Sequence, residues 1–275
     1  MTISPLASIS PGARIGANAT IGPFTVVHDD VVIGDDCTIE SHCVVGLPTA
    51  LAEGRVLELG DGALVRSHSV LYQGSRIGPG LRTGHHVTIR EGLVAGRSLQ
   101  VGTATDIQGS SVFGDFVRTH SSVFVAQGAT IGSYVWLSPG VILTDDPHPP
   151  SDGWRAGVTV EDFAVIAARA TVMPGIRVGT RSLVAAGALV TRDVAPDTVV
   201  AGVPARLLCP TSEVLLRDGS GRPAYPWMRH FHRGYPPEVV ERWVAAWGGL
   251  PPWDGDIAVS GDAGDPGAPT GSGAA

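Results

Sequence analysis

The 275-residue sequence contains no lysine, and all 19 of its basic residues are arginine. Charged residues make up only 16% of the chain, and the acidic ones outnumber the basic ones to give a formal net charge of −7. Proteins that bind nucleic acid neutralise phosphates with clustered basic side chains. The composition therefore argues against a nucleic-acid partner.

Cysteines and long apolar runs are also scarce. Cys37, Cys43 and Cys209 form no CxxC pair, so the sequence predicts neither a disulfide framework nor a zinc motif. No stretch of 18 apolar residues occurs, and the first residues lack the charged and apolar regions of a signal peptide. We expect a cytoplasmic protein with no membrane association.

Glycine and aliphatic residues are abundant, and the aliphatic ones recur every six positions. The first run ends at Val45, the second extends from Leu59 to Leu143, and the third from Val160 to Val190. Glycine often follows the residue at this repeating position directly, as at Gly16, Gly84 and Gly102, where we expect it to supply the backbone angles of a turn. The residue four positions after the aliphatic one is usually small, so we expect it to point inward as well.

A six-residue period fits neither a helix, which repeats every 3.6 residues, nor a flat alternating strand. It predicts an all-β solenoid in which each side of a coil takes six residues and equivalent positions stack 18 residues apart. The unit [LIV]-G-x-x-[small]-x resembles the repeat of hexapeptide acyltransferases. That resemblance implies a left-handed parallel β-helix, assembly into a homotrimer, acyl-CoA as co-substrate, and an active site between subunits.

The repeat predicts three regions. Residues 1–208 form the β-helix domain. Residues 209–248 form an arm whose segment PEVVERWVAAW has helical apolar spacing after a proline. Residues 249–275 consist mostly of Gly, Pro, Ala, Ser and Asp, and we expect them to be disordered.

Two histidines compete for the role of catalytic base. His120 follows the inward Thr119 at a corner where the repeat often has glycine, in the column of Gly84 and Gly102. Imidazole can accept a proton near neutral pH, as attack on a thioester requires. His148, in the interruption after Leu143, follows an aspartate pair and resembles the catalytic His-Pro segment of galactoside and maltose O-acetyltransferases.

The acceptor-binding candidates come from two segments that resemble those of sugar-nucleotide N-acyltransferases. The first, GHHVTIREG, supplies His85, His86, Arg90 and Glu91, for which a structural ion pair is an equal alternative. The second, LTDDPHPPS, supplies Asp145 and Asp146. γ-Class carbonic anhydrases bind zinc on this fold through three histidines, but no second histidine lies near His120 in the required pattern, so no metal is expected.

The segment from Ala170 to Leu208 closely resembles the terminal coils of CoA-dependent members, including the closing VAGVPAR. The resemblance implies contacts to CoA through small corner residues and arginines: Ala168, Ala186, Gly187, Arg192 and Arg206. Small residues are also what tight corners require.

The resemblance thus implies a transferase that uses acetyl-CoA or another acyl-CoA to acylate the amino group of a nucleotide-linked deoxyamino sugar. In that prediction the segment PWMRHFHRGYP of the arm either binds the nucleotide or holds the trimer together. Two alternatives stay open: O-acetylation of a sugar or small alcohol, and a non-catalytic solenoid that binds a ligand.

Overall fold

A computed structural model describes residues 1–151 and 155–246. The chain divides into two compact units, the first from Met1 to Thr211 and the second beginning at Ser212. The boundary lies three residues beyond the expected end of the β-helix domain. The tail at 249–275, for which the sequence predicts disorder, lies outside the described residues.

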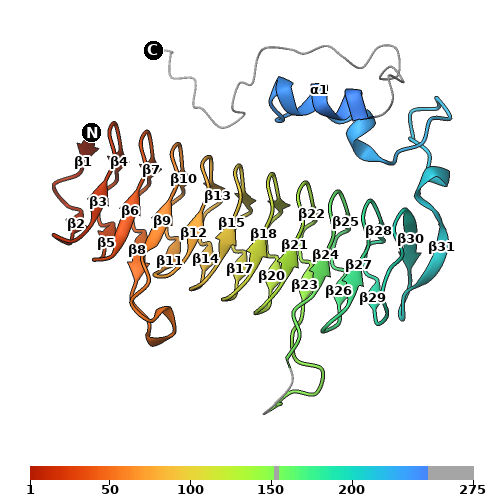
Figure 1. The fold of residues 1–275 in the computed structure, drawn as a ribbon, viewed down its shortest axis with the longest axis horizontal. Coiled ribbons are helices and arrows are strands. Elements are labelled where there is room, and N and C mark those ends of the chain that lie inside the picture. Colours follow the sequence, from red (N-terminus) through yellow and green to blue (C-terminus); the bar gives the residue numbers. More distant parts are fainter. Residues whose placement is uncertain (152–154, 247–275) are drawn as a thin grey trace, which may run out of the picture. The chain divides into compact units, whose positions relative to one another are not determined.

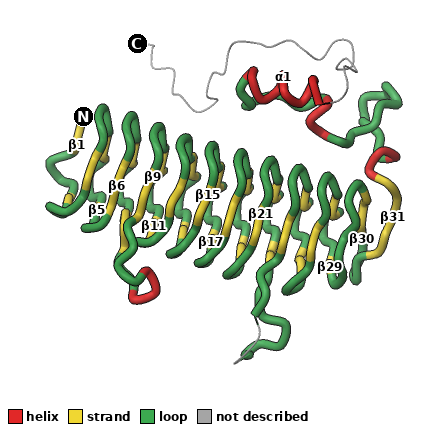
Figure 2. Tube along the Cα trace, viewed as in Figure 1, coloured by secondary structure: helices red, strands yellow, loops and turns green. Residues whose placement is uncertain are grey.

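The first unit is a parallel β-solenoid built from three sheets, here called A, B and C in chain order around each coil (Figures 1 and 2). Sheet A contains β1 (Thr2–Ile3), β4 (Thr20–Ile21), β7 (Thr38–Ile39), β10 (Leu64–Val65), β13 (Arg82–Thr83), β16 (Gln100–Val101), β19 (Arg118–Thr119), β22 (Trp136–Leu137), β25 (Val165–Ile166), β28 (Leu183–Val184), β30 (Thr198–Ala201) and β31 (Arg206–Pro210). Sheet B contains β2 (Ser8–Ile9), β5 (Val26–Val27), β8 (Val44–Leu47), β11 (Val70–Tyr72), β14 (Thr88–Ile89), β17 (Asp106–Ile107), β20 (Phe124–Val125), β23 (Ile142–Leu143), β26 (Thr171–Val172) and β29 (Leu189–Val190). Sheet C contains β3 (Arg14–Ile15), β6 (Val31–Ile33), β9 (Leu57–Leu59), β12 (Arg76–Ile77), β15 (Val94–Ala95), β18 (Val112–Phe113), β21 (Thr130–Ile131), β24 (Thr159–Val160) and β27 (Arg177–Val178).

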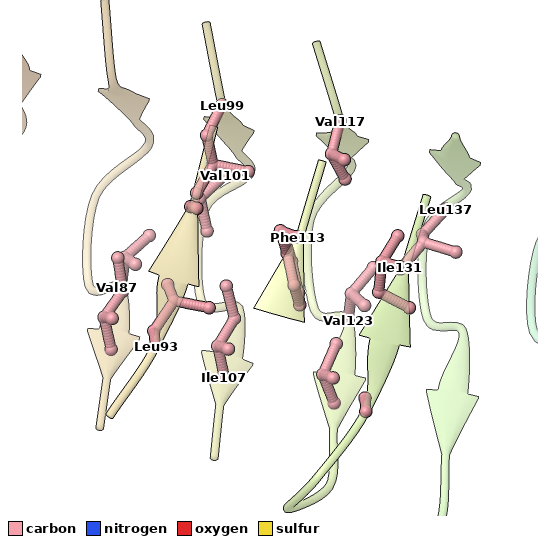
Figure 3. Close-up of a cluster of buried hydrophobic side chains, with 14 of the residues drawn as sticks. Val87, Leu93, Leu99, Val101, Ile107, Phe113, Val117, Val123, Ile131 and Leu137 are labelled. Atoms are coloured by element: carbon pink, nitrogen blue, oxygen red, sulfur yellow. The ribbon is translucent and has the colours of Figure 1, made fainter. Parts of the chain in front are cut away.

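The strand register confirms the predicted 18-residue stacking. Arg82 pairs with Gln100, Gln100 with Arg118, and Arg118 with Trp136, each step being one coil. Within a two-residue strand, the second residue points into the core. Aliphatic side chains from successive coils therefore stack along the prism (Figure 3). Because the small residues at the corners are buried too, each coil contributes several layers to one continuous core.

The corner glycines have a different role from the expected one. Gly16, Gly84 and Gly102 are not in the left-handed backbone region; instead, an added Cβ at each would lie 2.5 Å or less from the neighbouring coil. The left-handed residue comes two positions later, and there it is often a non-glycine residue such as His86 or Phe116. Glycine is needed here because the coils stack closely, and the turn itself tolerates other residues.

Both interruptions of the repeat leave the solenoid at the same edge. The first follows β8 and includes a short 3-10 turn at Ala50–Ala52, and the second follows β23. β8 and β23 both belong to sheet B, and each loop returns to sheet C (Figure 1). Strand pairing continues across each loop, so the loops project without breaking the stack.

The solenoid ends with a reversal of chain direction. β31 runs antiparallel to β30, whereas all other paired strands of the three sheets are parallel in the described part of the chain. The second unit contains 3-10 turns at Thr211–Glu213, which spans the boundary, and Trp227–Arg229, followed by the helix α1 (Pro237–Ala246). Val239 and Trp243 of α1 are buried. The observed architecture confirms the predicted all-β solenoid with a short C-terminal helix. No helix within 1–151 and 155–246 has the length and apolarity to cross a bilayer.

Candidate active site

The candidate residues fall on two edges of the prism. The A–B edge is the set of corners that lead from a sheet A strand to the next sheet B strand, and the B–C edge is defined likewise. His85, His86 and His120 lie on the A–B edge, because each follows a sheet A strand. Arg90, Glu91 and the loop with Asp145, Asp146 and His148 lie on the B–C edge.

His120 begins the corner after β19. Thr119 before it is buried, as predicted, and its hydroxyl accepts a hydrogen bond from the Gly102 backbone N–H at 3.2 Å. The His120 backbone N–H donates to the Leu137 carbonyl at 2.8 Å, and the His120 carbonyl accepts from the Thr105 hydroxyl at 2.9 Å. The backbone that carries the imidazole is therefore fixed from both neighbouring coils.

His120 is exposed, and its imidazole lies beside the Trp136 side chain on the outer face of sheet A. Its ring centroid is 5.8 Å from that of Trp136, at an interplanar angle of 40°. The Arg118 guanidinium carbon lies 4.9 Å from the Trp136 ring centroid. Partial desolvation, and secondly the charge of Arg118, lower the pKa of His120 below its usual value. The imidazole is thus favoured in its neutral form, which can accept a proton.

His85 occupies the same edge two coils away, at about 10 Å by the spacing of strands. Its Nδ1 lies 2.9 Å from the Ser67 hydroxyl oxygen and 3.9 Å from Glu40 Oε2. The same Glu40 oxygen accepts the Ser67 backbone N–H at 3.0 Å. These contacts orient one nitrogen of His85 toward the protein.

His86 belongs to a stack of rings along the A–B edge. Phe24, His42, His68 and His86 stack with successive centroid distances of 5.0, 4.9 and 4.8 Å. Desolvation, followed by the neighbouring histidines, lowers the pKa of His68. His86 is therefore the last ring of a ladder of stacked side chains along this edge.

Three of the CoA-contact candidates continue the A–B edge beyond His120. Ala168 follows β25, and Ala186 and Gly187 follow β28, so the row of small corners leads from His120 toward the last coils. Arg192 instead lies on the B–C edge, and Arg206 begins β31. Both arginines line one hollow of about 280 Å³ at the end of the solenoid, together with Val190, Val200 and Ala205.

On the B–C edge, Arg90 and Glu91 form a two-pronged ion pair. Arg90 Nε and one terminal nitrogen donate to the two Glu91 oxygens at 3.0 and 3.2 Å. The Arg90 guanidinium carbon lies 4.8 Å from the centroid of the Tyr72 ring. Glu91 is buried, and its hydrogen bond and charge raise the pKa of Arg90. This geometry matches the structural ion pair that the sequence left open as an alternative.

The loop after β23 holds itself together through Asp146. That carboxylate accepts the backbone N–H groups of His148 and Ser151 at 3.0 and 3.1 Å, and also the Ser151 hydroxyl. The Ser151 hydroxyl is the main cause that lowers the pKa of Asp146. Asp145 pairs with Arg155 at 3.8 Å. His148 itself is exposed at the loop.

The described residues contain no group of three or more His, Cys, Asp or Glu side chains arranged to hold a metal ion.

Comparison with known proteins supports the hexapeptide repeat and the fold. Residues 3–47 match the family model described as bacterial transferase hexapeptide (six repeats). The repeat of this chain is thus similar to that of the hexapeptide transferases over the matched residues.

Two relatives from Staphylococcus aureus are 2,3,4,5-tetrahydropyridine-2,6-dicarboxylate N-acetyltransferases. The one from strain bovine RF122 / ET3-1 is 44% identical over 85 residues, which is 31% of this chain and 34% of the relative. The one from strain MRSA252 is 42% identical over 85 residues, with the same coverage. The matched region thus spans about a third of the length of these curated relatives.

Two solved structures share the fold. The Arabidopsis UDP-N-acetylglucosamine acyltransferase superposes with a TM-score of 0.62 at 19% identity and covers 89% of this chain and 88% of its own. LpxA from Bacteroides fragilis 9343, also a UDP-N-acetylglucosamine acyltransferase, gives a TM-score of 0.57 at 21% identity over 89% and 82%. These neighbours are left-handed β-helices, the handedness expected for the hexapeptide repeat.

Within this hexapeptide-repeat chain, the segment GHHVTIREG is divided between two edges, because β14 separates His86 from Arg90. His120 and His148 also lie on different edges, His120 on the A–B edge and His148 on the B–C edge. Sequence reasoning missed Arg118 and Trp136, the side chains beside His120. The two residues are 18 positions apart, which corresponds to one coil of the repeat. That spacing was the signal that could have found them.

Proposed function

We propose that this protein is an acyl-CoA-dependent N-acyltransferase with His120 as general base. The observation that carries the proposal is an imidazole with a lowered pKa on a backbone held from both neighbouring coils, with the small corner residues Ala168, Ala186 and Gly187 farther along the same edge. N-acetyl transfer by the relatives supports acetyl as the acyl group and an amine as the acceptor. The preferred acceptor is the amino group of a nucleotide-linked deoxyamino sugar.

In the proposed reaction, the neutral acceptor amine attacks the thioester carbonyl carbon. The new C–N bond forms, the C–S bond breaks, and one amine proton passes to His120. The imidazolium then gives that proton to the departing CoA thiolate, so the products are an amide and free CoA. A positioned base of this kind contributes about 10² to 10⁴-fold to the rate.

A homotrimer would bring the two edges together. The outer face of sheet B is the most apolar of the three, with Val26, Val44, Val70, Phe124, Ile142 and Leu189 in its outward positions. If that face turns toward a threefold axis, the A–B edge of one subunit faces the B–C edge of the next. His120 would then face the loop of the partner subunit, which lies on the other edge of its own prism.

The assembly is tested by charge substitution on two faces. Phe124 and Ile142 are in register on sheet B and are 38% and 40% exposed. Val94 and Val112 are in register on sheet C and are 49% and 50% exposed, which makes them a matched control. We expect F124R/I142R to be monomeric by light scattering and V94R/V112R to be trimeric. Equal behaviour of the two pairs would contradict the proposed axis.

The activity is tested by thiol release from acetyl-CoA with a panel of aminodeoxy sugar nucleotides and their hydroxyl analogues. We expect turnover with an amine only, a loss of about 10² to 10⁴-fold in His120→Ala, and near-native activity in His148→Ala. Turnover with the hydroxyl analogue, or loss in His148→Ala alone, would favour O-acetylation. A silent scaffold would show no stabilisation by CoA, whereas a ligand at 100 times its Kd adds about 2.7 kcal/mol.

A further inference from the structure

On the outer face of sheet A, the Trp136 ring lies beside the His120 imidazole and Arg118 lies against the Trp136 ring. Neither residue is among those that carry the proposed chemistry. We propose that Trp136 and Arg118 are positioning residues, Trp136 orienting the His120 ring and Arg118 setting its charge state. This inference rests on the proposed function, in which His120 is the base.

The first step is geometric. Arg118 and Trp136 are paired in register on β19 and β22, so their side chains emerge next to each other on one face. Their backbone N–H groups donate to Val135 and Ala164 at 2.9 and 3.1 Å, which fixes both strands. Both side chains are half-buried. The indole thus forms a flat wall with Arg118 against it and the His120 ring at its side.

The second step concerns the direction of proton transfer. A guanidinium keeps its charge at all working pH values, so it disfavours a second positive charge nearby. Arg118 therefore adds to the desolvation that disfavours protonation of His120 before the attack, and afterward it favours release of the proton to the CoA thiolate. The stacked neighbours of His120 on the adjacent coils, Gly102 and Ser138, carry no charge that would oppose this effect.

The lowered pKa of His120, caused first by desolvation and then by Arg118, has the direction that the second step requires. Arg82 provides a matched control, because it occupies the same outward column of sheet A two coils from Arg118.

The experiment is an NMR titration of the His120 imidazole in the full chain, together with the pH profile of kcat/KM. In Arg118→Gln we expect the pKa of His120 to rise and the acidic limb of the profile to move to higher pH with it. Arg118→Lys, which keeps the charge, should leave both near their native positions, and so should Arg82→Gln. An unchanged pKa in Arg118→Gln, or an equal rise in Arg82→Gln, would overturn the assignment of Arg118.

The role of Trp136 is tested by Trp136→Leu and Trp136→Phe. Leucine removes the flat wall, so we expect kcat to fall with little change in the KM for acetyl-CoA, and the His120 ring resonances to shift. Phenylalanine should restore most of kcat. Equal activity of Trp136→Leu and the native chain would overturn this part.

The NMR titration needs no turnover, so it separates the two proposals. If the pKa of His120 responds to Arg118 as expected but no acceptor is acylated, the coupling of these side chains stands and the proposed function fails. If acylation occurs and the titration is insensitive to Arg118, the function stands and the positioning proposal fails.

Discussion

Substitution of Gly102 by alanine should impair catalysis more than stability. An added Cβ at Gly102 would lie 2.3 Å from the His120 carbonyl carbon and 2.5 Å from the Ser121 nitrogen. Real Cβ atoms almost never approach closer than 3.0 Å, so the two coils must separate locally by about 0.7 Å or more. The corner that moves is the one that carries the proposed base.

The expected magnitudes follow from that displacement. Overpacking of this kind costs about 1–3 kcal/mol of stability. A misplacement of about 1 Å at a reacting group can cost about 10²-fold in rate. We therefore expect Gly102→Ala to remain folded at 25 °C while its kcat/KM falls by about ten- to a hundredfold.

Gly60→Ala is the matched control. Its Cβ would lie 2.5 Å from the Pro79 nitrogen, again against backbone, but at the corner between sheets C and A. The two variants should have similar urea unfolding midpoints, whereas only Gly102→Ala should lose activity when both are assayed at equal folded fraction. If both variants keep native activity, the position of His120 does not control the reaction, and the reasoning fails.

Three further predictions concern the solenoid itself. Leu99→Ala, at a fully buried core position, should lower the free energy of unfolding by about 2–5 kcal/mol in urea titrations, and a loss below 1 kcal/mol would show that the core relaxes around the gap. Because the pKa of His68 is lowered in the folded state, the unfolded chain binds more protons, and stability should fall as pH drops below about 6.5. The slope of melting temperature against pH should therefore be shallower in His68→Gln than in the native chain. Burial raises the pKa of the Cys37 and Cys43 thiols, so a thiol reagent at pH 8 should modify the partly buried Cys209 first and the other two only on unfolding; early modification of Cys37 would contradict the described core.

The six-residue period was sufficient to predict the fold, because each inward position repeats the same demand for a small or aliphatic side chain. The same period placed Thr119 inward and His120 at a corner, as observed. The period alone could not assign residues to edges, because that assignment also requires the number of sides in each coil. His86 and Arg90 are four residues apart, yet β14 places them on different edges of the prism.

Other features depend on contacts between coils, which a linear reading does not display. The corner glycines seemed to serve turn geometry, but close approach of the neighbouring coil explains them, as at Gly102. The role of Asp146 within its loop depends on hydrogen bonds to His148 and Ser151, for which no repeat provides a rule. Regular positions were therefore predictable, whereas side-chain partners in the interruptions were not.

The reversed direction of β31 limits how such a stack can grow. A parallel coil placed beyond it would have to pair with a strand of the opposite sense, and Pro210 at its end lacks the N–H group that a further ladder needs. In sheet A, β31 therefore disfavours continuation of the parallel ladder by a coil from another molecule at this end. Removal of β31 from its antiparallel pair with β30 should therefore make the solenoid more prone to associate end to end.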